Sequence, residues 1–552
     1  MNADKRRPEK GWNWQSQILR PKFLSAFICV HLWLIFLLSC SSKPTDLRTL
    51  VPAETLVYLE TNDLGAALQP IVDSKPFNEV AKRKPDLSAL KGVQLAVAIT
   101  GFETSEEKLT DEHSVGKVQP HFVAVADTHA WHFQAVAFAE QKLGAFVAEM
   151  YDSDTTLDKP EKNGGRYLTW TAKDGRKAYA FVIGSLIYFT NDETAIDKCL
   201  AVKRGEADSI VKTGKVMPAD PGTLAAGYVS TDGIAQIANL AGLQLASQSS
   251  DDGEVQSAIA GLLPQLLRGS ITDISWTATR ESQGVQQGSF VDKYKVTMKP
   301  EIAQVFAETL APAGQIDATV FESLSAELKD LTIYNFKDPQ VAWRSVLLTA
   351  QKQTDPLAGK VLGEFSGAFF EPYGIRDPQL FLTSVSGSIL TARLDDEGEK
   401  PVVIASLKDP DKAKKAFVAD LKPNKQATDE NGVEVWRSDD GDVAAAFVEN
   451  KIITGDADAV IKCLKSRASG NTLNKSPAIV DFFRANASTV TLASDKTTAA
   501  ATAELLSEKA SEDANANSIY IAETRFTRSG IERRTVSDLG LIGSIIAQLA
   551  EN

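Results

Sequence analysis

Hydrophobic and polar residues alternate over many short stretches of this chain, and helical spacing separates these stretches. Alternating runs at residues 167–172 and 178–183 flank Asp174-Gly175, a pair that favours the tight turn of a β-hairpin. Residues 131–150 instead carry apolar side chains every three to four positions, as an amphipathic helix does. Hairpins predominate over strand–helix–strand crossovers in this pattern, which predicts an α+β fold with largely antiparallel sheets.

The second half of the chain repeats features of the first. Trp170 and Trp436, Asp174-Gly175 and Asp440-Gly441, and Ala180-Phe181-Val182 and Ala446-Phe447-Val448 are each 266 residues apart. Cys199 and Cys463 match at 264 residues, and Tyr58 matches Tyr334 further upstream. A period of this length is typical of a duplicated domain and not of a short-repeat solenoid.

We therefore expect two homologous tandem α+β domains, residues 51–312 and 313–552, with the join where Pro312 and Gly314 interrupt a helical pattern. In the second domain Asp338-Pro339 and Asp409-Pro410 are predicted to begin helices, because an aspartate cap and a proline suit the first turn. Residues 101–119 and 152–165 are predicted polar loops. The apolar stretch 539–549 is expected to pack in the core of its own domain or, alternatively, to bind a partner.

Basic residues and a short apolar run mark the N-terminal segment. Arg20 and Lys22 precede an apolar run over residues 23–38, and Leu37-Leu38-Ser39-Cys40 follows at its end. This run is shorter than the roughly 20 residues of a membrane-spanning helix, which favours a processed export segment.

The segment resembles a bacterial lipoprotein signal peptide. That resemblance implies that residues 1–39 are removed, that Cys40 is acylated, and that residues 40–50 form a tether. Ser41 at the following position resembles lipoproteins sorted to the outer membrane, with the body in the periplasm or at the cell surface. An uncleaved signal anchor is the alternative, and it too places the body outside the cytoplasm.

The charge of the chain limits its partners. The net charge is −13 and residues 1–39 contain six Lys/Arg and two Asp/Glu, so the processed body carries −13 − 4 = −17. Such an acidic chain is not expected to bind nucleic acid. Membrane contact is expected through the acyl chains, because no basic amphipathic stretch is evident.

Histidines and carboxylates are the candidate chemical groups. His113, His121, His129 and His132 are the histidines that follow Cys40, and the spacing of the last two suggests either a metal or acid–base site or ordinary surface and helix-cap residues. Clusters at Asp152/Asp154, Asp395-Asp396-Glu397 and Asp439-Asp440-Gly441-Asp442 lack the spacing of a calcium-binding EF-hand loop. Motifs of serine hydrolases, phosphate-binding loops and zinc proteases are absent from the sequence.

The remaining candidates are cysteines and tryptophans. Cys199 and Cys463 each lie on an apolar helix face and are expected to be buried free thiols. Trp170 and Trp436 could stack a sugar or an apolar ligand, although a tryptophan in a sheet more often packs in the core. We predict no catalytic residue, cofactor or metal, and lipidation at Cys40.

Pro52-Ala53-Glu54-Thr55, echoed by Pro218-Ala219-Asp220, resembles the opening of an uncharacterised family of bacterial secreted and membrane-tethered proteins. The resemblance implies tandem strand–helix units and supplies no chemistry. Together these features predict a noncatalytic, lipid-anchored envelope protein that binds or scaffolds another envelope component. The alternatives are a carrier of a hydrophobic ligand and a metal-dependent hydrolase that uses the histidines.

Overall fold

The computed structural model describes residues 45–550, apart from 109–113, 152, 217, 219, 221, 250–252, 283–286, 326–327, 396, 418–420, 424–432, 476–485 and 508–515. Cys40, His113, Asp152 and Asp396 therefore lie outside the described residues, as does the predicted signal peptide. We call residues 45–312 the first half and residues 313–550 the second half.

The same order of strands occurs in both halves, and every pairing is antiparallel. In sheet order, the first half contains β4 (Thr155–Asp158) and β5 (Glu161–Lys162), both on β6 (Gly165–Ala172), then β7 (Lys177–Ile183), β8 (Leu186–Thr190), β3 (Ser114–Asp127), β2 (Gln94–Lys108), β1 (Val57–Thr61), β9 (Ala225–Val229), β10 (Ile271–Arg280) and β11 (Phe290–Met298). The second half contains β15 (Lys422–Pro423), β16 (Glu434–Arg437), β17 (Val443–Val448), β18 (Lys451–Asp456), β14 (Pro401–Leu407), β13 (Val385–Arg393), β12 (Asp330–Tyr334), β19 (Thr489–Asp495), β20 (Ser518–Thr527) and β21 (Gly530–Ser537).

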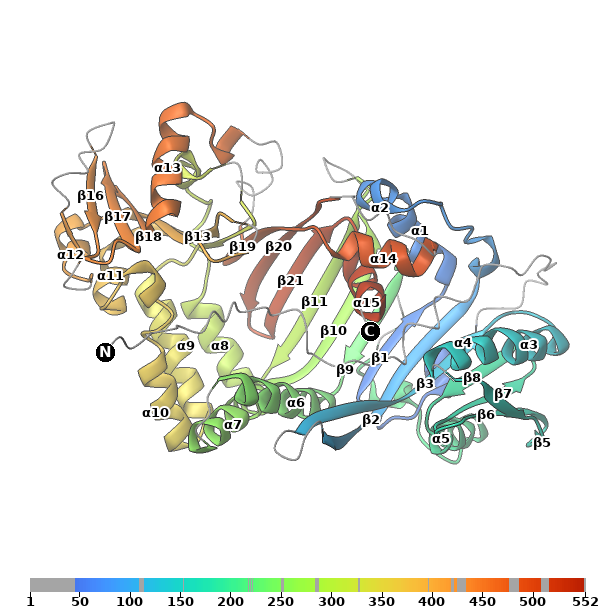
Figure 1. Cartoon of the computed structure of the whole chain (residues 1–552). Helices are drawn as coiled ribbons and strands as arrows, with labels where there is room; N and C mark the ends of the chain where they lie inside the picture. The colour runs from blue at the N-terminus through green and yellow to red at the C-terminus, as the bar shows by residue number, and fades with distance from the viewer. Residues whose placement is uncertain are drawn as a thin grey trace, which may run out of the picture.

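A single large antiparallel sheet joins the halves, so the expectation of an α+β fold with two homologous tandem domains is wrong. Strand β11 pairs with β21 from Phe290 opposite Ser537 to Thr297 opposite Gly530. Without this pairing, the last hairpin of each half would leave the backbone groups of one strand unpaired, and such edges readily pair with each other. Figure 1 shows the resulting sheet running across the molecule, from β16 at one end to β5 and β6 at the other.

Helices occupy both surfaces of this sheet. The first half contains α1 (Leu64–Asp73), α2 (Lys75–Val80), α3 (His132–Phe138), α4 (Gly144–Met150), α5 (Glu193–Arg204), α6 (Thr231–Ser249), α7 (Gly253–Ser270) and α8 (Pro300–Thr309). The second half contains α9 (Pro339–Gln353), α10 (Pro356–Phe365), α11 (Pro378–Ser384), α12 (Pro410–Lys414), α13 (Ala457–Ser469), α14 (Thr498–Ser507) and α15 (Gly540–Ala550). The predicted caps are confirmed, since Asp338 accepts a hydrogen bond from the Val341 amide and Asp409 from the Lys412 amide.

The helices that follow the two central hairpins each pack on the opposite half. Helix α8 contacts α9, β20 and β21, whereas α15 contacts α1 and β11. Leu539, just before α15, and Ile546 within it share one buried cluster with Ile71, Trp276 and Phe290 of the first half. Helix α15 also packs on α14 of its own half, as expected for residues 539–549, and the packing extends to the first half because the sheet brings it within reach. Figure 1 shows α14 and α15 lying across the central strands beside α1 and α2.

The duplicated sequence features need a shift of one residue to match the strands. Asp63 and Asp338 both cap the helix that follows the first strand of their half, so Tyr58 corresponds to Ile333 and not to Tyr334. Burial agrees, because Tyr58 and Ile333 are fully buried and Tyr334 is exposed. A shift of one residue exchanges the two faces of a strand, so identical letters alone misplace these side chains.

Two predicted loops are extended strands. Strands β2 and β3 continue as a hairpin to Lys108 opposite Ser114, within the predicted loop 101–119. Strands β4 and β5 both pair with β6 inside the predicted loop 152–165. The side chains of β4 and β5 are largely exposed, which explains the polar sequence there. The hairpin turns at Asp174-Gly175 and Asp440-Gly441 are confirmed, with positive φ at Gly175 and Gly441.

Candidate functional site

The four central strands β10, β11, β21 and β20 have two different faces. Successive side chains of a strand point to opposite sides, and Trp276, Phe290 and Tyr294 point toward α15, where they belong to the joint cluster or pack against it. The side chains between them point the other way. We call this opposite surface the central sheet face.

The central sheet face is a grid of polar side chains drawn equally from both halves. The register aligns them in two rows across the four strands. One row is Thr277, Lys293, Arg534 and Glu523, and the other is Ser275, Lys295, Glu532 and Arg525.

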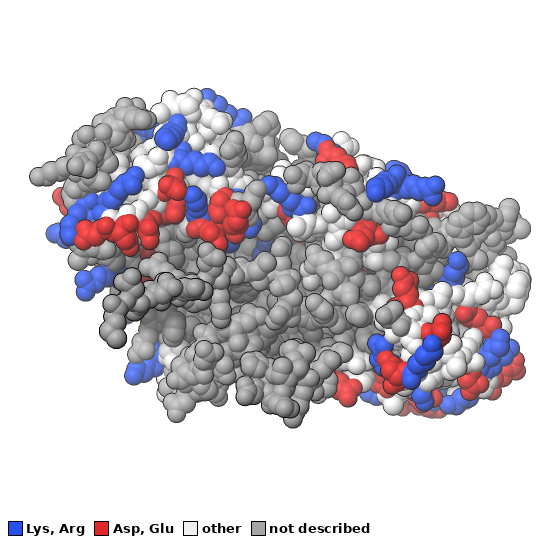
Figure 2. Space-filling model, viewed as in Figure 1, with Lys and Arg blue, Asp and Glu red and all other residues white. Residues whose placement is uncertain are grey.

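The exposed charges of this face are mostly positive. Lys293, Lys295 and Arg525 are exposed, and Arg534 is half-buried. Glu532 is exposed as well, so the exposed charges sum to +3 − 1 = +2, on a chain that carries −13. The half-buried Arg534 lies with three half-buried carboxylates, those of Glu523, Glu281 and, in the next row, Asp273. In the parts drawn in Figure 2, both ends of the molecule instead show Lys and Arg interleaved with Asp and Glu.

Ion pairs hold part of the grid in place. The Arg534 guanidinium contacts the Glu281 carboxylate and lies 4.0 Å from that of Glu523, and Arg525 lies 3.8 Å from Glu523. The side chain of Arg525 is 53% exposed, so its pair is weakened by solvent. Lys293 lies directly opposite Arg534, and like charges opposite each other destabilise a sheet. An anion above this pair would relieve the repulsion.

A buried carboxylate ties the two halves together behind this face. Asp292 Oδ1 accepts a hydrogen bond of 2.9 Å from Trp276 Nε1, and its Oδ2 accepts one of 3.0 Å from the Leu541 amide at the start of α15. Burial raises the pKa of Asp292 to about 6, although both hydrogen bonds favour the charged form. Asp292 thus links a strand of the first half to a helix of the second.

The described histidines have separate partners. His129 Nδ1 lies 3.4 Å from the Asp127 carboxylate, and His132 Nδ1 lies 3.4 Å from the Gly184 carbonyl oxygen. His121 lies between Glu103 and Asp192, at 3.4 and 3.6 Å. Helix α3 begins at His132, so His129 precedes it in the loop with a left-handed φ of 51°. In the described part of the chain, no three His, Cys, Asp or Glu side chains are grouped to hold a metal ion.

The other predicted residues have structural surroundings. Cys199 and Cys463 are free and fully buried, as expected, and burial raises the pKa of each thiol to about 12. Trp170 is 1% exposed and belongs to a core cluster, which confirms the packing interpretation. Trp436 is only half-buried and donates a hydrogen bond of 2.7 Å to Glu434. Asp440 accepts hydrogen bonds from Ser438 and the Asp442 amide within its hairpin turn.

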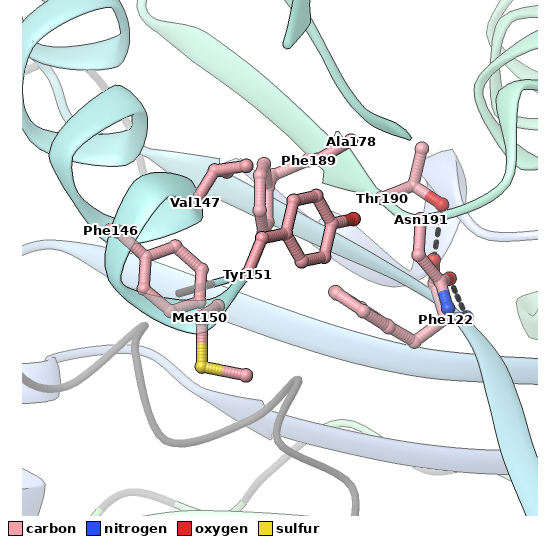
Figure 3. Close-up of a pocket in the computed structure, with 9 residues that line it drawn as sticks. All are labelled: Phe122, Phe146, Val147, Met150, Tyr151, Ala178, Phe189, Thr190 and Asn191. Atoms are coloured by element: carbon pink, nitrogen blue, oxygen red, sulfur yellow. Dashed lines mark hydrogen bonds between the residues drawn. The ribbon is translucent and has the colours of Figure 1, made fainter. Parts of the chain in front are cut away.

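Two hollows in the described residues each lie within one half. Figure 3 shows the first, of about 10 Å³, lined by apolar side chains that include Phe146 and Met150. Ligand pockets typically measure about 300–1,000 Å³, so this one is small for a carried lipid. The second, of about 410 Å³, is open to solvent and lined by charged residues that include Asp395, Lys400 and Asp458.

The central sheet face escaped the sequence reasoning, although a signal for it exists. Charged residues occupy alternate positions at Lys293 and Lys295, which indicates a polar face on that strand. Glu532, Arg533 and Arg534 are consecutive and place charge on both faces of their strand. Neither pattern predicts that the two strands are neighbours.

Comparison with known proteins gives no match for this chain among protein-family models, curated proteins or solved structures. Within the residues that the structure describes, no helix is both long enough and apolar enough to span a bilayer.

Proposed function

We propose that this protein is a noncatalytic, lipid-anchored component of the bacterial envelope that binds an anionic envelope partner through the central sheet face. One observation carries the proposal. Lys293 and Arg534 lie opposite each other at the junction of the two halves, with Lys295 and Arg525 in the adjacent row, on a chain of net charge −13. This cationic surface needs both halves, because each contributes two of the four cations.

The proposed binding mode is contact with a flat surface. A sheet with two polar rows presents charges at fixed spacings of about 4.7–4.9 Å between strands. Such a surface suits an extended acidic protein segment or a polyanionic polymer, whose charges can follow the rows. Electrostatic contacts of this kind favour fast, salt-sensitive association.

Anchoring in the proposal relies on Cys40, five residues before the first described residue. Acylation there would hold the body at a membrane surface, and stable anchoring needs more than one acyl chain. The partner would then meet the protein within the same envelope layer.

Affinity capture from envelopes tests the proposal. Lys293→Glu/Lys295→Glu reverses two of the four cations, and we expect it to abolish the recovery of an acidic component that the unmodified protein retains. Lys82→Glu/Lys91→Glu makes the same charge change at two exposed lysines outside the central sheet face and is the matched control. Equal recovery with both variants would refute a role for this face. An intact mass without acyl chains at Cys40 would refute the anchor.

A further inference from the structure

Two exposed aromatic side chains mark the start of α3. Trp131 is 67% exposed and Phe133 is 69% exposed. They lie in a stretch, residues 128–139, that contains no Asp, Glu, Lys or Arg. Exposed apolar groups of this size, clustered and free of charge, are typical of an interaction surface.

The corresponding helix of the second half shows that the fold does not need these aromatics. Helices α3 and α12 each follow the strand that pairs with β2 or β13. Helix α12 is capped by Asp409 and carries Asp411, Lys412 and Lys414, so the same place in the fold is highly charged. Trp131 occupies the cap position that Asp409 has in α12.

The loop that presents the aromatic pair is held firmly. The Thr128 amide and hydroxyl both donate to the Ser185 carbonyl oxygen, at 3.1 and 3.0 Å. The His129 amide donates to Asp127 Oδ1 at 3.0 Å, and the Trp131 amide donates to Gln134 Oε1 at 3.2 Å. A rigid loop loses little conformational entropy when its aromatic side chains insert into another medium.

The tether reaches the body beside this loop. Thr45 donates from its hydroxyl to Asp127 Oδ2 at 2.6 Å and from its amide to Gln94 Oε1 at 2.9 Å. Cys40 lies five residues earlier, a span of at most about 17 Å. Trp131 lies four residues after Asp127, at most about 14 Å along the chain. The tether thus joins the body where β3 leads into the loop before α3, at the right-hand end of Figure 1, and acyl chains at Cys40 would begin within these distances of it.

We propose that Trp131 and Phe133 insert into the headgroup region of the phospholipid bilayer to which Cys40 is anchored. Tryptophan favours this region because its ring is apolar and its indole N–H remains hydrated. The aromatic pair would then be a second membrane contact that fixes the orientation of the body. This inference rests on the acylation in the proposed function.

Fluorescence quenching by lipid tests the inference. The full chain is produced in a bacterium that processes lipoproteins, then reconstituted into phosphatidylethanolamine/phosphatidylglycerol vesicles with and without brominated phosphatidylcholine. In a Trp131→Phe background, Phe133→Trp places a reporter in the aromatic pair. Phe369→Trp is the matched control, because Phe369 is 68% exposed on the second half.

Each signal is taken as the difference from the Trp131→Phe parent, because Trp170, Trp276, Trp343 and Trp436 remain. In that difference we expect brominated lipid to quench the tryptophan added at position 133 at least fivefold more than the one added at position 369. Equal quenching at the two positions, or none at position 133, in protein that floats with the vesicles would overturn the inference and leave the anchor intact. Protein that fails to float would overturn both proposals. Unchanged circular dichroism of each variant verifies that folding is preserved.

Discussion

Truncating Ile546 to alanine should destabilise both halves of the protein together. Ile546 is fully buried, and its cluster contains Ile71 and Phe290 of the first half. Replacing such an isoleucine with alanine typically costs about 2–5 kcal/mol, through lost burial and the cavity that remains. Urea unfolding followed by tryptophan fluorescence, in variants that retain only Trp170 or only Trp436, reports on the two halves separately.

We expect Ile546→Ala to lower the urea midpoint of both reporters. Ile196→Ala is the matched control in a cluster confined to the first half, and Ile404→Ala is its counterpart in the second. A midpoint that falls for Trp436 and stays unchanged for Trp170 would show that α15 does not stabilise the first half. The reasoning from a shared core would then be refuted.

Three further predictions concern single groups. The pKa of Asp292 is about 6 in the folded chain and 3.8 in the reference state, so the folded chain binds more protons between these pH values. The contribution of Asp292 to the free energy of unfolding is therefore full below pH 3.8 and falls by about 3 kcal/mol as pH rises through 6. Urea unfolding from pH 4 to 7 should show a smaller decline in Asp292→Asn. Gly530→Ala should lower the thermal midpoint strongly, because φ is 134° and a Cβ would meet the Val296 carbonyl oxygen. Gly441→Ala is the control for backbone strain alone, because φ is 84° there and the space around the Cβ is open. Equal midpoints of the two variants would contradict the close approach of β21 to β11. Cys199 and Cys463 should both resist a thiol reagent at pH 8 until denaturant is added, since each is fully buried; rapid labelling of the folded protein, detected by mass, would contradict their burial.

Local features of the fold were predictable from the sequence. The hairpin turns at Gly175 and Gly441 and the helix caps at Asp338 and Asp409 depend on neighbouring residues, and all occur where predicted. The burial of Cys199 followed from its apolar helix face in the same way. In each case a short segment contains the information that determines its own conformation.

The joining of the halves could not be predicted in this way. Phe290 and Ser537 are opposite each other in the sheet but 247 residues apart in sequence, and no local pattern specifies which edge a strand finds. The placement of α15 on the first half follows from that pairing, so it was missed for the same reason. The central sheet face depends on the pairing as well, because its rows cross from β11 to β21.

Disulfide formation between Lys295→Cys and Glu532→Cys measures directly whether β11 and β21 are neighbours in one sheet. These residues lie directly opposite each other on β11 and β21, at a Cα separation of about 4.5–5.5 Å that a disulfide can span. We expect mild oxidation to crosslink this pair within one chain. The control pair, Lys295→Cys with Arg525→Cys, should stay reduced, because Arg525 lies one strand further away. Failure of the first pair to crosslink would contradict the single sheet on which the central sheet face depends.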